Sequence, residues 1–102
     1  MERIVYMARL CPEKVEGYRK AHQEVWPELI SEATKSGVKN HGCFLRGCDL
    51  VIYLETENYE QTLADLNAKA VVKKWDASMS EFFDPGFPSQ ESEPWDEVFP
   101  MD

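Results

Sequence analysis

The spacing of hydrophobic side chains changes along this chain in a fixed order, and that order constrains the fold more than any other feature. Residues 3–10 are rich in β-branched and aromatic side chains, which predicts a strand. From Val15 the apolar residues recur every three or four positions, as on an amphipathic helix. The strand would place its even-numbered side chains on one face: Ile4, Tyr6, Ala8 and Leu10.

The first predicted helix contains a proline. It begins near Pro12, which suits a first helical turn, and ends at Ser36-Gly37, because glycine is the common left-handed cap. Pro27 lies inside the helical pattern, where it removes a backbone hydrogen bond and clashes with the preceding turn. We therefore expect a kink or a break near Trp26.

Two further strands are predicted at 40–46 and 50–55. Gly47-Cys48-Asp49 between them is short enough for a hairpin connection. The second of these strands is apolar without alternation. We therefore expect it in the interior of the sheet, covered on both faces.

The second half of the chain predicts another helical region. Asn58 is a plausible N-cap, and Gln61 completes a capping-box pattern for a helix over 59–67. A second helical stretch then follows, and Asp84-Pro85-Gly86 ends it. Its apolar residues recur at helical spacing: Val71, Trp75, Met79 and Phe82.

The C-terminal residues predict an arm followed by a strand. Residues 84–94 are rich in Pro, Ser and Glu, and residues 95–99 read as a short final strand. The predicted order is therefore strand, helix, strand, strand, helix, strand. This is the ferredoxin-like βαββαβ arrangement of the α+β class, an antiparallel sheet with helices on one face.

The length of 102 residues is that of one domain, so we expect a single domain over 1–102 with an arm at 84–102. The uncovered face of such a sheet needs a cover, most simply a second subunit. We therefore expect a homodimer that resembles a dimeric α/β barrel. Trp95 and Phe99 make the arm a candidate to reach across the interface.

Charge and cysteine content limit the partners. The chain carries 19 acidic and 11 basic residues, a net charge of −8. An acidic surface repels phosphate backbones and anionic lipid, so we expect neither nucleic acid nor membrane as a partner. The three cysteines, an odd number, and the lack of a signal peptide or a long apolar run favour reduced thiols and a cytoplasmic location.

Tyr18, His22 and Trp26 are the most informative residues for function. Their four-residue spacing places them on neighbouring turns of one helix face. His22 is a natural proton carrier near neutral pH, and Tyr18 can donate or accept a hydrogen bond. A structural role is the competing interpretation for each: a hydrogen-bonded histidine, a core tyrosine, and a tryptophan that packs beneath the kinked helix.

Three later residues complete the candidate site. Trp75 offers an indole face that suits the C–H-rich face of a sugar, although its helical neighbours also fit a core position. Asp76 follows it, and His41 begins the second predicted strand. The chain has no phosphate-binding glycine loop, no metal-binding histidine pair and no nucleophile elbow. We therefore expect proton transfer on a small neutral molecule, with no cofactor and no metal.

These residues resemble the L-rhamnose mutarotase family over nearly the whole chain. The similarity rests on Tyr18-x-x-x-His22-x-x-x-Trp26-Pro27-Glu28, on Asn40, on Trp75-x-x-x-Met79 and on the closing Glu97-Val98-Phe99. Family members are small dimeric proteins with a ferredoxin-like fold that interconvert the anomers of a 6-deoxy sugar.

The resemblance implies roles for individual residues. His22 resembles the acid/base residue, and the sugar-contacting positions are Tyr18, His41, Trp75 and Asp76. Position 41 is commonly tyrosine and position 76 often tryptophan in rhamnose enzymes, so this chain is more polar at both. L-fucose mutarotation is therefore the alternative activity. Two other classes stay open: a cofactor-free oxygenase on the same fold, and a sugar-binding module without catalysis.

Overall fold

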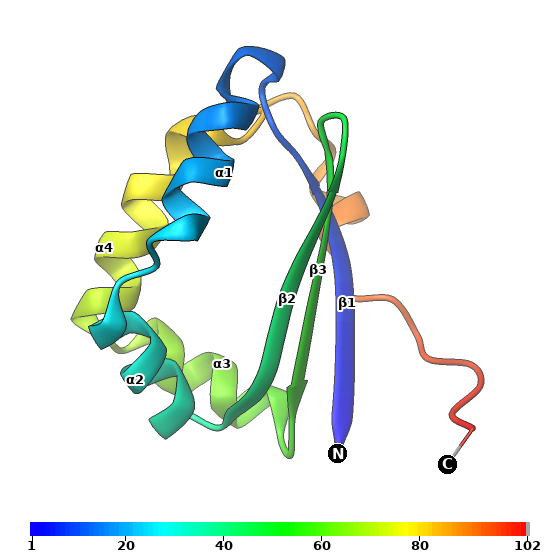
Figure 1. The fold of residues 1–102 in the computed structure, drawn as a ribbon. Coiled ribbons are helices and arrows are strands. Elements are labelled where there is room, and N and C mark those ends of the chain that lie inside the picture. The colour runs from blue at the N-terminus through cyan, green and yellow to red at the C-terminus, as the bar shows by residue number, and fades with distance from the viewer. Residues whose placement is uncertain (102) are drawn as a thin grey trace.

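The computed structural model describes residues 1–101, apart from the side chain of Ser89. Its centre is an antiparallel sheet of three strands, β1 (Glu2–Arg9), β2 (Val38–Arg46) and β3 (Asp49–Thr56), in the order β1-β3-β2. The four α-helices of this described part lie on one side of the sheet (Figure 1). The predicted α+β class, with helices on one face of an antiparallel sheet, is confirmed.

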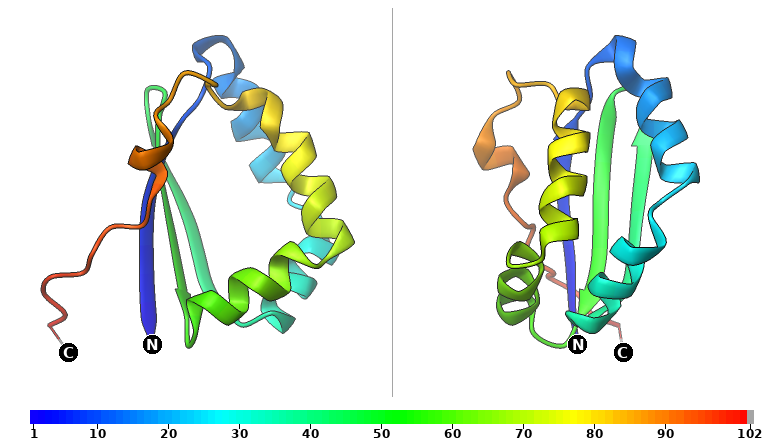
Figure 2. Two further views of the ribbon diagram at one scale, coloured as in Figure 1. Left: turned by 180° about the vertical axis from the view of Figure 1, so that it is seen from behind. Right: turned by 90° about the vertical axis from the view of Figure 1, so that its left-hand side faces the viewer.

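The helices form two bands over the sheet. In the right-hand view of Figure 2, α1 and α2 follow one another in one band, and α3 and α4 form the other. Short 3-10 turns adjoin α1 at Pro12–Lys14 and α4 at Ser80–Phe82, and a third lies in the arm at Ser89–Ser92. The helix bounds are α1 Val15–Gln23, α2 Pro27–Lys35, α3 Tyr59–Asn67 and α4 Ala70–Met79.

The break predicted at Pro27 is confirmed. The α1 helix ends at Gln23, and α2 begins with Pro27 as its first residue. Trp26 lies between them in an extended conformation, with φ −60° and ψ 126°. A residue before proline avoids helical dihedrals, so the chain turns here and starts a new helix.

Two glycines lie where the sequence predicted the end of a helix and a hairpin turn. Gly37 follows the last residues of α2 with φ 105°, a conformation that side chains with a Cβ rarely adopt. Gly47 has φ 63° in the turn between β2 and β3, which confirms the predicted hairpin.

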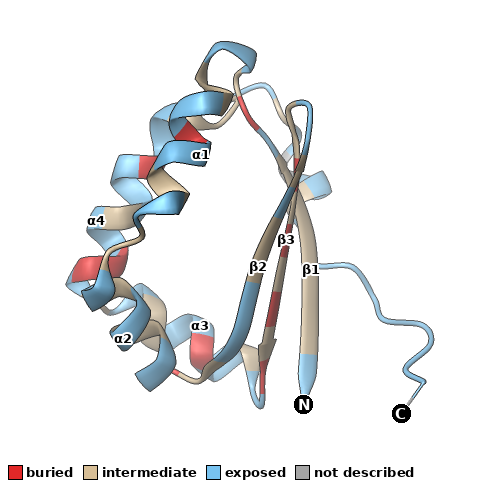
Figure 3. Cartoon of the chain, in the orientation of Figure 1, coloured by how far each residue is buried: buried red, intermediate tan, exposed pale blue. Residues whose placement is uncertain are grey.

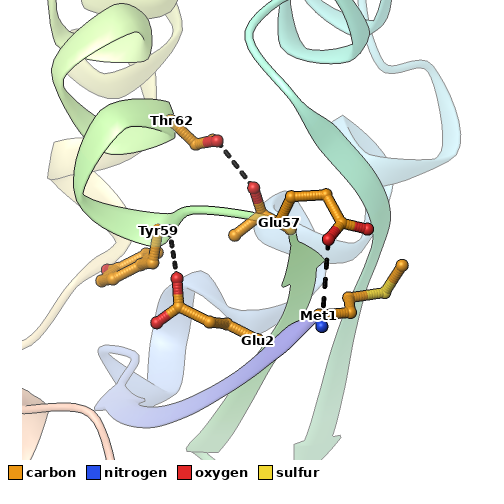
Figure 4. Close-up of polar contacts among 6 residues, drawn as sticks. Met1, Glu2, Glu57, Tyr59 and Thr62 are labelled. Atoms are coloured by element: carbon orange, nitrogen blue, oxygen red, sulfur yellow. Dashed lines mark hydrogen bonds and ion pairs between the residues drawn. The ribbon is translucent and has the colours of Figure 1, made fainter.

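The start of α3 is tied to the sheet by hydrogen bonds (Figure 4). The side chain of Asn58 accepts from the Gln61 amide at 3.1 Å, which confirms the predicted N-cap. The predicted capping box was wrong in its second hydrogen bond: the Gln61 side chain does not return to the Asn58 amide but donates to Asp65 at 2.9 Å. The Glu2 carboxylate of β1 accepts from the Tyr59 amide at 2.6 Å, where an anion offsets the positive end of the helix dipole.

The core lies between the helices and one face of the sheet. On β3 every second residue is buried, as the red bands of that strand show in Figure 3. The register places Ile4, Tyr6 and Ala8 opposite Leu54, Ile52 and Leu50, so the shared face predicted for the first strand is confirmed. The buried cluster consists of Leu10, Tyr18, Leu50, Ile52 and Met79.

The other face of the sheet is open in the single chain. β3 is the central strand, but its residues alternate between buried and half-buried, so the expectation of full cover on both faces was wrong for one chain. Phe44 on β2 is 62% exposed. Val51, directly opposite Phe44, and Val5 and Tyr53 of the neighbouring pair share this face.

The final strand predicted at 95–99 does not form within the described residues. The Trp95 amide donates to the Val5 carbonyl oxygen at 2.8 Å, and Arg3 pairs with Glu97 at 2.6 Å. These contacts hold the arm against β1 without the repeated main-chain bonds of a ladder. Beyond that point the chain runs away from the body (Figure 1). In the described part of the chain, no helix is both long and apolar enough to cross a bilayer.

Candidate active site

Tyr18 and His22 lie on the face of α1 that packs toward the sheet. Four residues apart, they stack with ring centroids 4.1 Å apart and ring planes at 28°. Tyr18 is only 5% exposed, whereas His22 is half-buried. The helix therefore places the phenol in the core and the imidazole at its margin.

One nitrogen of His22 is fixed by the backbone. Its Nδ1 lies 3.0 Å from the carbonyl oxygen of Tyr18. Because a carbonyl oxygen can only accept, Nδ1 must carry the proton of this hydrogen bond. In the neutral ring Nε2 is then the nitrogen without a proton, and it is available for exchange with a ligand.

Trp75 of α4 reaches the imidazole from the second helical band. Its indole meets the His22 ring edge-on, with centroids 5.4 Å apart and planes at 76°. Trp26, in the break between α1 and α2, contacts the same indole at 5.1 Å and 86°. The fold thus brings together three aromatic side chains that were singled out in the sequence.

A hollow of about 330 Å³ lies between α1 and α4, and both indoles line it. Tyr18, His22, His41 and Asp76 are not among its lining residues. The other residues around this hollow are Gly17, Lys20, Ala21, Glu24 and Met79. Trp26 is therefore half-buried: it packs against Trp75 and also lines this hollow.

Cys43 of β2 closes the cluster on the sheet side. The Tyr18 hydroxyl donates to Cys43 Sγ at 3.8 Å. Burial, with the nearby Cys43 thiol, raises the pKa of Tyr18 well above its usual range. Burial also raises the pKa of the Cys43 thiol. Both groups are therefore neutral at physiological pH, and neither acts as a base.

His41 lies two residues before Cys43 on the same face of β2. The register places it opposite the buried Leu54, so its side chain projects toward the helices. The residue is solvent-exposed because β2 is an edge strand. Although part of the residue is open to solvent, the neighbouring protein partly desolvates its ring. This desolvation, and then the electrostatic effect of His22, lower the pKa of His41 and so favour the neutral imidazole.

Asp76 and two tyrosines complete the polar groups near the cluster. Burial raises the pKa of Asp76, although this residue keeps an exposed surface. Tyr6 of β1 has a pKa raised to about 12, first by burial and then by Tyr59, Cys43 and Asp76 nearby. The five predicted site residues thus belong to α1, to α4 and to the helix-facing side of β2.

Tyr6 and Cys43, which share the helix-facing side of the sheet with His41, were not assigned to the site from the sequence. A tyrosine among the small and aliphatic residues of one strand face was a signal for Tyr6. No comparable signal marked Cys43, because its position beside Tyr18 depends on which elements pack together.

The arrangement suits a small polyhydroxylated ring. Imidazole, phenol and carboxylate groups can form hydrogen bonds with hydroxyls, and indole surfaces can pack against C–H groups. Within residues 1–101, no group of three or more His, Cys, Asp or Glu side chains is placed to hold a metal ion. Imidazole and carboxylate groups can also accept and donate protons.

Comparison with known proteins identifies the family. The family profile of L-rhamnose mutarotase matches residues 3–101. The L-rhamnose mutarotase of Sinorhizobium fredii is 32% identical over 87 residues, which cover 82% of each chain. The crystal structure of an L-rhamnose mutarotase from Formosa agariphila has 25% identity and a TM-score of 0.78, with 100% of both chains covered.

A more distant structure shares the fold. Tetracenomycin F2 cyclase from Streptomyces glaucescens has a TM-score of 0.71 at 11% identity, covering 100% of this chain and 98% of its own. That likeness concerns the architecture alone. The match over residues 3–101 and the relative at 32% identity lead to one conclusion: this chain belongs to the L-rhamnose mutarotase family.

Proposed function

We propose that this protein interconverts the α and β anomers of L-rhamnose by opening and closing the sugar ring. The observation that carries the proposal is the position of His22 in a member of this family. Its ring is held between the Tyr18 phenol and the Trp75 indole, and its Nδ1 is bound to the Tyr18 carbonyl oxygen. A fixed imidazole with Nε2 free is suited to pass a proton to and from a sugar oxygen.

The proposed reaction begins with protonation of the ring oxygen. His22, as imidazolium, gives it a proton while the anomeric hydroxyl loses one, and the bond between C1 and the ring oxygen breaks. The open aldehyde turns about its C1–C2 bond, and closure on the other face gives the second anomer. Tyr18, His41, Trp75 and Asp76 contact the sugar in this proposal, and no cofactor takes part.

Saturation-transfer NMR on the two anomers tests the proposal directly. The protein should accelerate anomer exchange of L-rhamnose above the spontaneous rate, and His22→Ala should remove that acceleration. A positioned acid or base typically contributes ~10²–10⁴-fold. Circular dichroism should show that the variant stays folded. An unchanged exchange rate in folded His22→Ala would refute the role of His22.

The same NMR measurement, together with an oxygen-consumption assay, separates the alternatives. Faster exchange of L-fucose than of L-rhamnose would make the protein an L-fucose mutarotase. Binding of sugar without faster exchange would make it a sugar-binding module. Oxygen consumption with quinol-type compounds, and no sugar binding, would support a cofactor-free oxygenase.

We also propose that two copies pair through the open face of the sheet. Phe44 on that face is 62% exposed, and a hollow of about 280 Å³ lies between this face and the arm. The arm carries further exposed apolar residues, with Val98 91% and Phe99 75% exposed. A second subunit would cover these surfaces, and the arm at 84–102 would contact it. A cytoplasmic location remains our proposal from the sequence.

A further inference from the structure

We propose that His41 is the second proton carrier of the reaction, paired with His22 across the contact between α1 and β2. The anomeric hydroxyl must lose a proton while the ring oxygen gains one, so the reaction needs two groups. This inference rests on the proposed mutarotase function and names the group that would accept the hydroxyl proton.

The contact between Tyr18 and Cys43 fixes how α1 lies against β2. The Tyr18 hydroxyl donates to Cys43 Sγ at 3.8 Å, so these two residues lie side by side, at the same height along the strand direction of the sheet. His22 comes one helical turn after Tyr18, about 6 Å further along the axis. His41 comes two residues before Cys43, about 7 Å back along the strand on the same face.

The α1 helix and the β2 strand run in opposite directions. The step from Tyr18 forward to His22 and the step from Cys43 back to His41 therefore point in the same direction along the sheet. In Figure 1, α1 descends from the top of the molecule toward α2, whereas β2 rises from the end of α2 to the hairpin at the top. Moving forward along α1 and backward along β2 therefore brings His22 and His41 to the same level. The pKa of His41 agrees with this placement, since after desolvation the electrostatic effect of His22 contributes to lowering it.

His41 is suited to accept a proton. It is exposed on an edge strand, so a ligand can reach it, and its side chain projects to the same side of the sheet as Cys43. Its backbone amide donates to the Asn40 side chain at 3.0 Å, which steadies the strand at this point. Because its pKa is lowered, the ring is a neutral base at neutral pH.

The other titratable groups of the cluster fit this assignment less well. Tyr6, Tyr18 and Cys43 have raised pKa values, so they are neutral donors at neutral pH. Asp76 of α4 is the competing base, although burial makes its charged form less favourable. The experiment therefore includes a variant of Asp76.

The proton balance closes over one cycle. His22 imidazolium protonates the ring oxygen as its bond to C1 breaks, and His41 takes the proton of the anomeric hydroxyl as the C1 carbonyl forms. In the open form His22 is neutral and His41 is charged. During closure His22 removes the proton of the attacking hydroxyl, and His41 protonates the carbonyl oxygen. Both rings return to their starting states, and no other reactant is needed.

The test compares His41→Gln with the wild-type protein. Glutamine keeps a polar side chain of similar length but cannot carry a proton at neutral pH. We expect the accelerated exchange of L-rhamnose to fall by ~10²-fold or more. The affinity for L-rhamnose, measured by NMR titration, should change little. Arg46→Gln is the matched control, since it removes a charge from the exposed end of β2 and should leave the exchange rate intact.

Each outcome decides between the proposals. If the wild-type protein does not accelerate exchange, the proposed function fails. If the wild-type protein is active but His41→Gln keeps its rate, only the role of His41 is refuted. A loss explained entirely by weaker sugar binding would make His41 a binding residue and also refutes the inference. If Asp76→Asn, rather than His41→Gln, removes the rate with binding intact, Asp76 is the base.

A second measurement is independent of activity. The chain has two histidines, so their ring signals can be assigned by removing each in turn. In an NMR titration His41 should have a pKa below its usual value, and His22→Gln should move it upward. An unchanged His41 pKa in that variant would show that the two rings do not face each other.

Discussion

The backbone carbonyl of Tyr18 accepts a hydrogen bond from Nδ1 of His22 at 3.0 Å, while the two rings stack with centroids 4.1 Å apart. The same residue therefore fixes both the tautomer and the orientation of the imidazole. Because the accepting group is main-chain, this hydrogen bond does not depend on the Tyr18 hydroxyl. The phenol and the imidazole can thus be tested separately.

Tyr18→Phe tests the phenol alone. Phenylalanine keeps the ring in the core and the carbonyl contact to His22 but removes the hydroxyl that donates to Cys43. The free energy of unfolding should fall by ~0.5–1 kcal/mol, the lower part of the range for one hydrogen bond, because a thiol sulfur is a weak acceptor. If the hydroxyl takes part in the reaction, turnover slows or KM for L-rhamnose rises. If the turnover rate and KM are both unchanged, the Tyr18 hydroxyl has only a structural role.

Asp76→Asn should stabilise the folded protein, and this gain over the wild-type protein should grow as the pH rises. Burial raises the pKa of this carboxyl in the folded protein, so above pH 3.8 the folded state holds its proton longer than the unfolded state does. Stability is then lost as the pH rises through the folded pKa, and asparagine avoids that loss.

Urea unfolding between pH 4 and pH 7 measures the effect of Asp76→Asn. The stability gain of the variant should grow with pH, while its affinity for L-rhamnose should fall if Asp76 contacts the sugar. A gain that is equal at both ends of this range would mean that the carboxyl does not titrate abnormally.

Gly37→Ala should destabilise the fold strongly. Gly37 has φ 105°, and a Cβ there would lie 2.7 Å from Thr62 Oγ1. Thr62 is buried and hydrogen-bonded to Thr56 at 2.7 Å, so it cannot move away easily. We expect a loss of ~1–3 kcal/mol from backbone strain, to which the clash adds.

Gly47→Ala is the matched control for that variant. Its φ is 63°, but nothing lies within 4 Å of an added Cβ. The loss in free energy of unfolding should be limited to the ~1–2 kcal/mol that a residue with a Cβ costs in the left-handed conformation. Thermal denaturation of both variants compares the two costs, and equal losses would contradict the role of the Thr62 contact.

Phe44→Asp should prevent pairing of two chains. A charge on the open face of the sheet would have to be buried in the proposed interface, which is strongly unfavourable. Sedimentation velocity should then show a dimer for the wild-type protein and a monomer for the variant. Ile30→Asp on α2 is the control, since Ile30 is 55% exposed on another surface. A monomeric wild-type protein would refute the proposed dimer.

Local interactions explain why much of the fold could be predicted. Pro27 ends one helix and begins the next because of its own ring, and Gly37 caps α2 because of its own missing Cβ. The stripe of Tyr18 and His22 follows from the helical repeat alone. The family resemblance, which rested on such residues, is confirmed over residues 3–101.

The predictions that were wrong depended on distant partners. Residues 95–99 have the composition of a strand, but a strand needs a neighbouring edge that matches it, and Trp95 makes only one main-chain bond with Val5. Gln61 was expected to return to Asn58, yet its side chain bonds Asp65 one turn ahead. In both cases several partners were available, and the sequence pattern does not rank them.

The sequence by itself determined the elements up to residue 82, their order and the side chains that share a face, because these follow from periods of two and 3.6 residues and from the backbone limits of proline and glycine. Only the tertiary structure decided that the Trp75 indole meets the His22 ring, and that Tyr6, His41 and Cys43 face the same helices. Those contacts join residues from separate elements. They arise from how helices pack on a sheet of fixed register, which no local pattern contains.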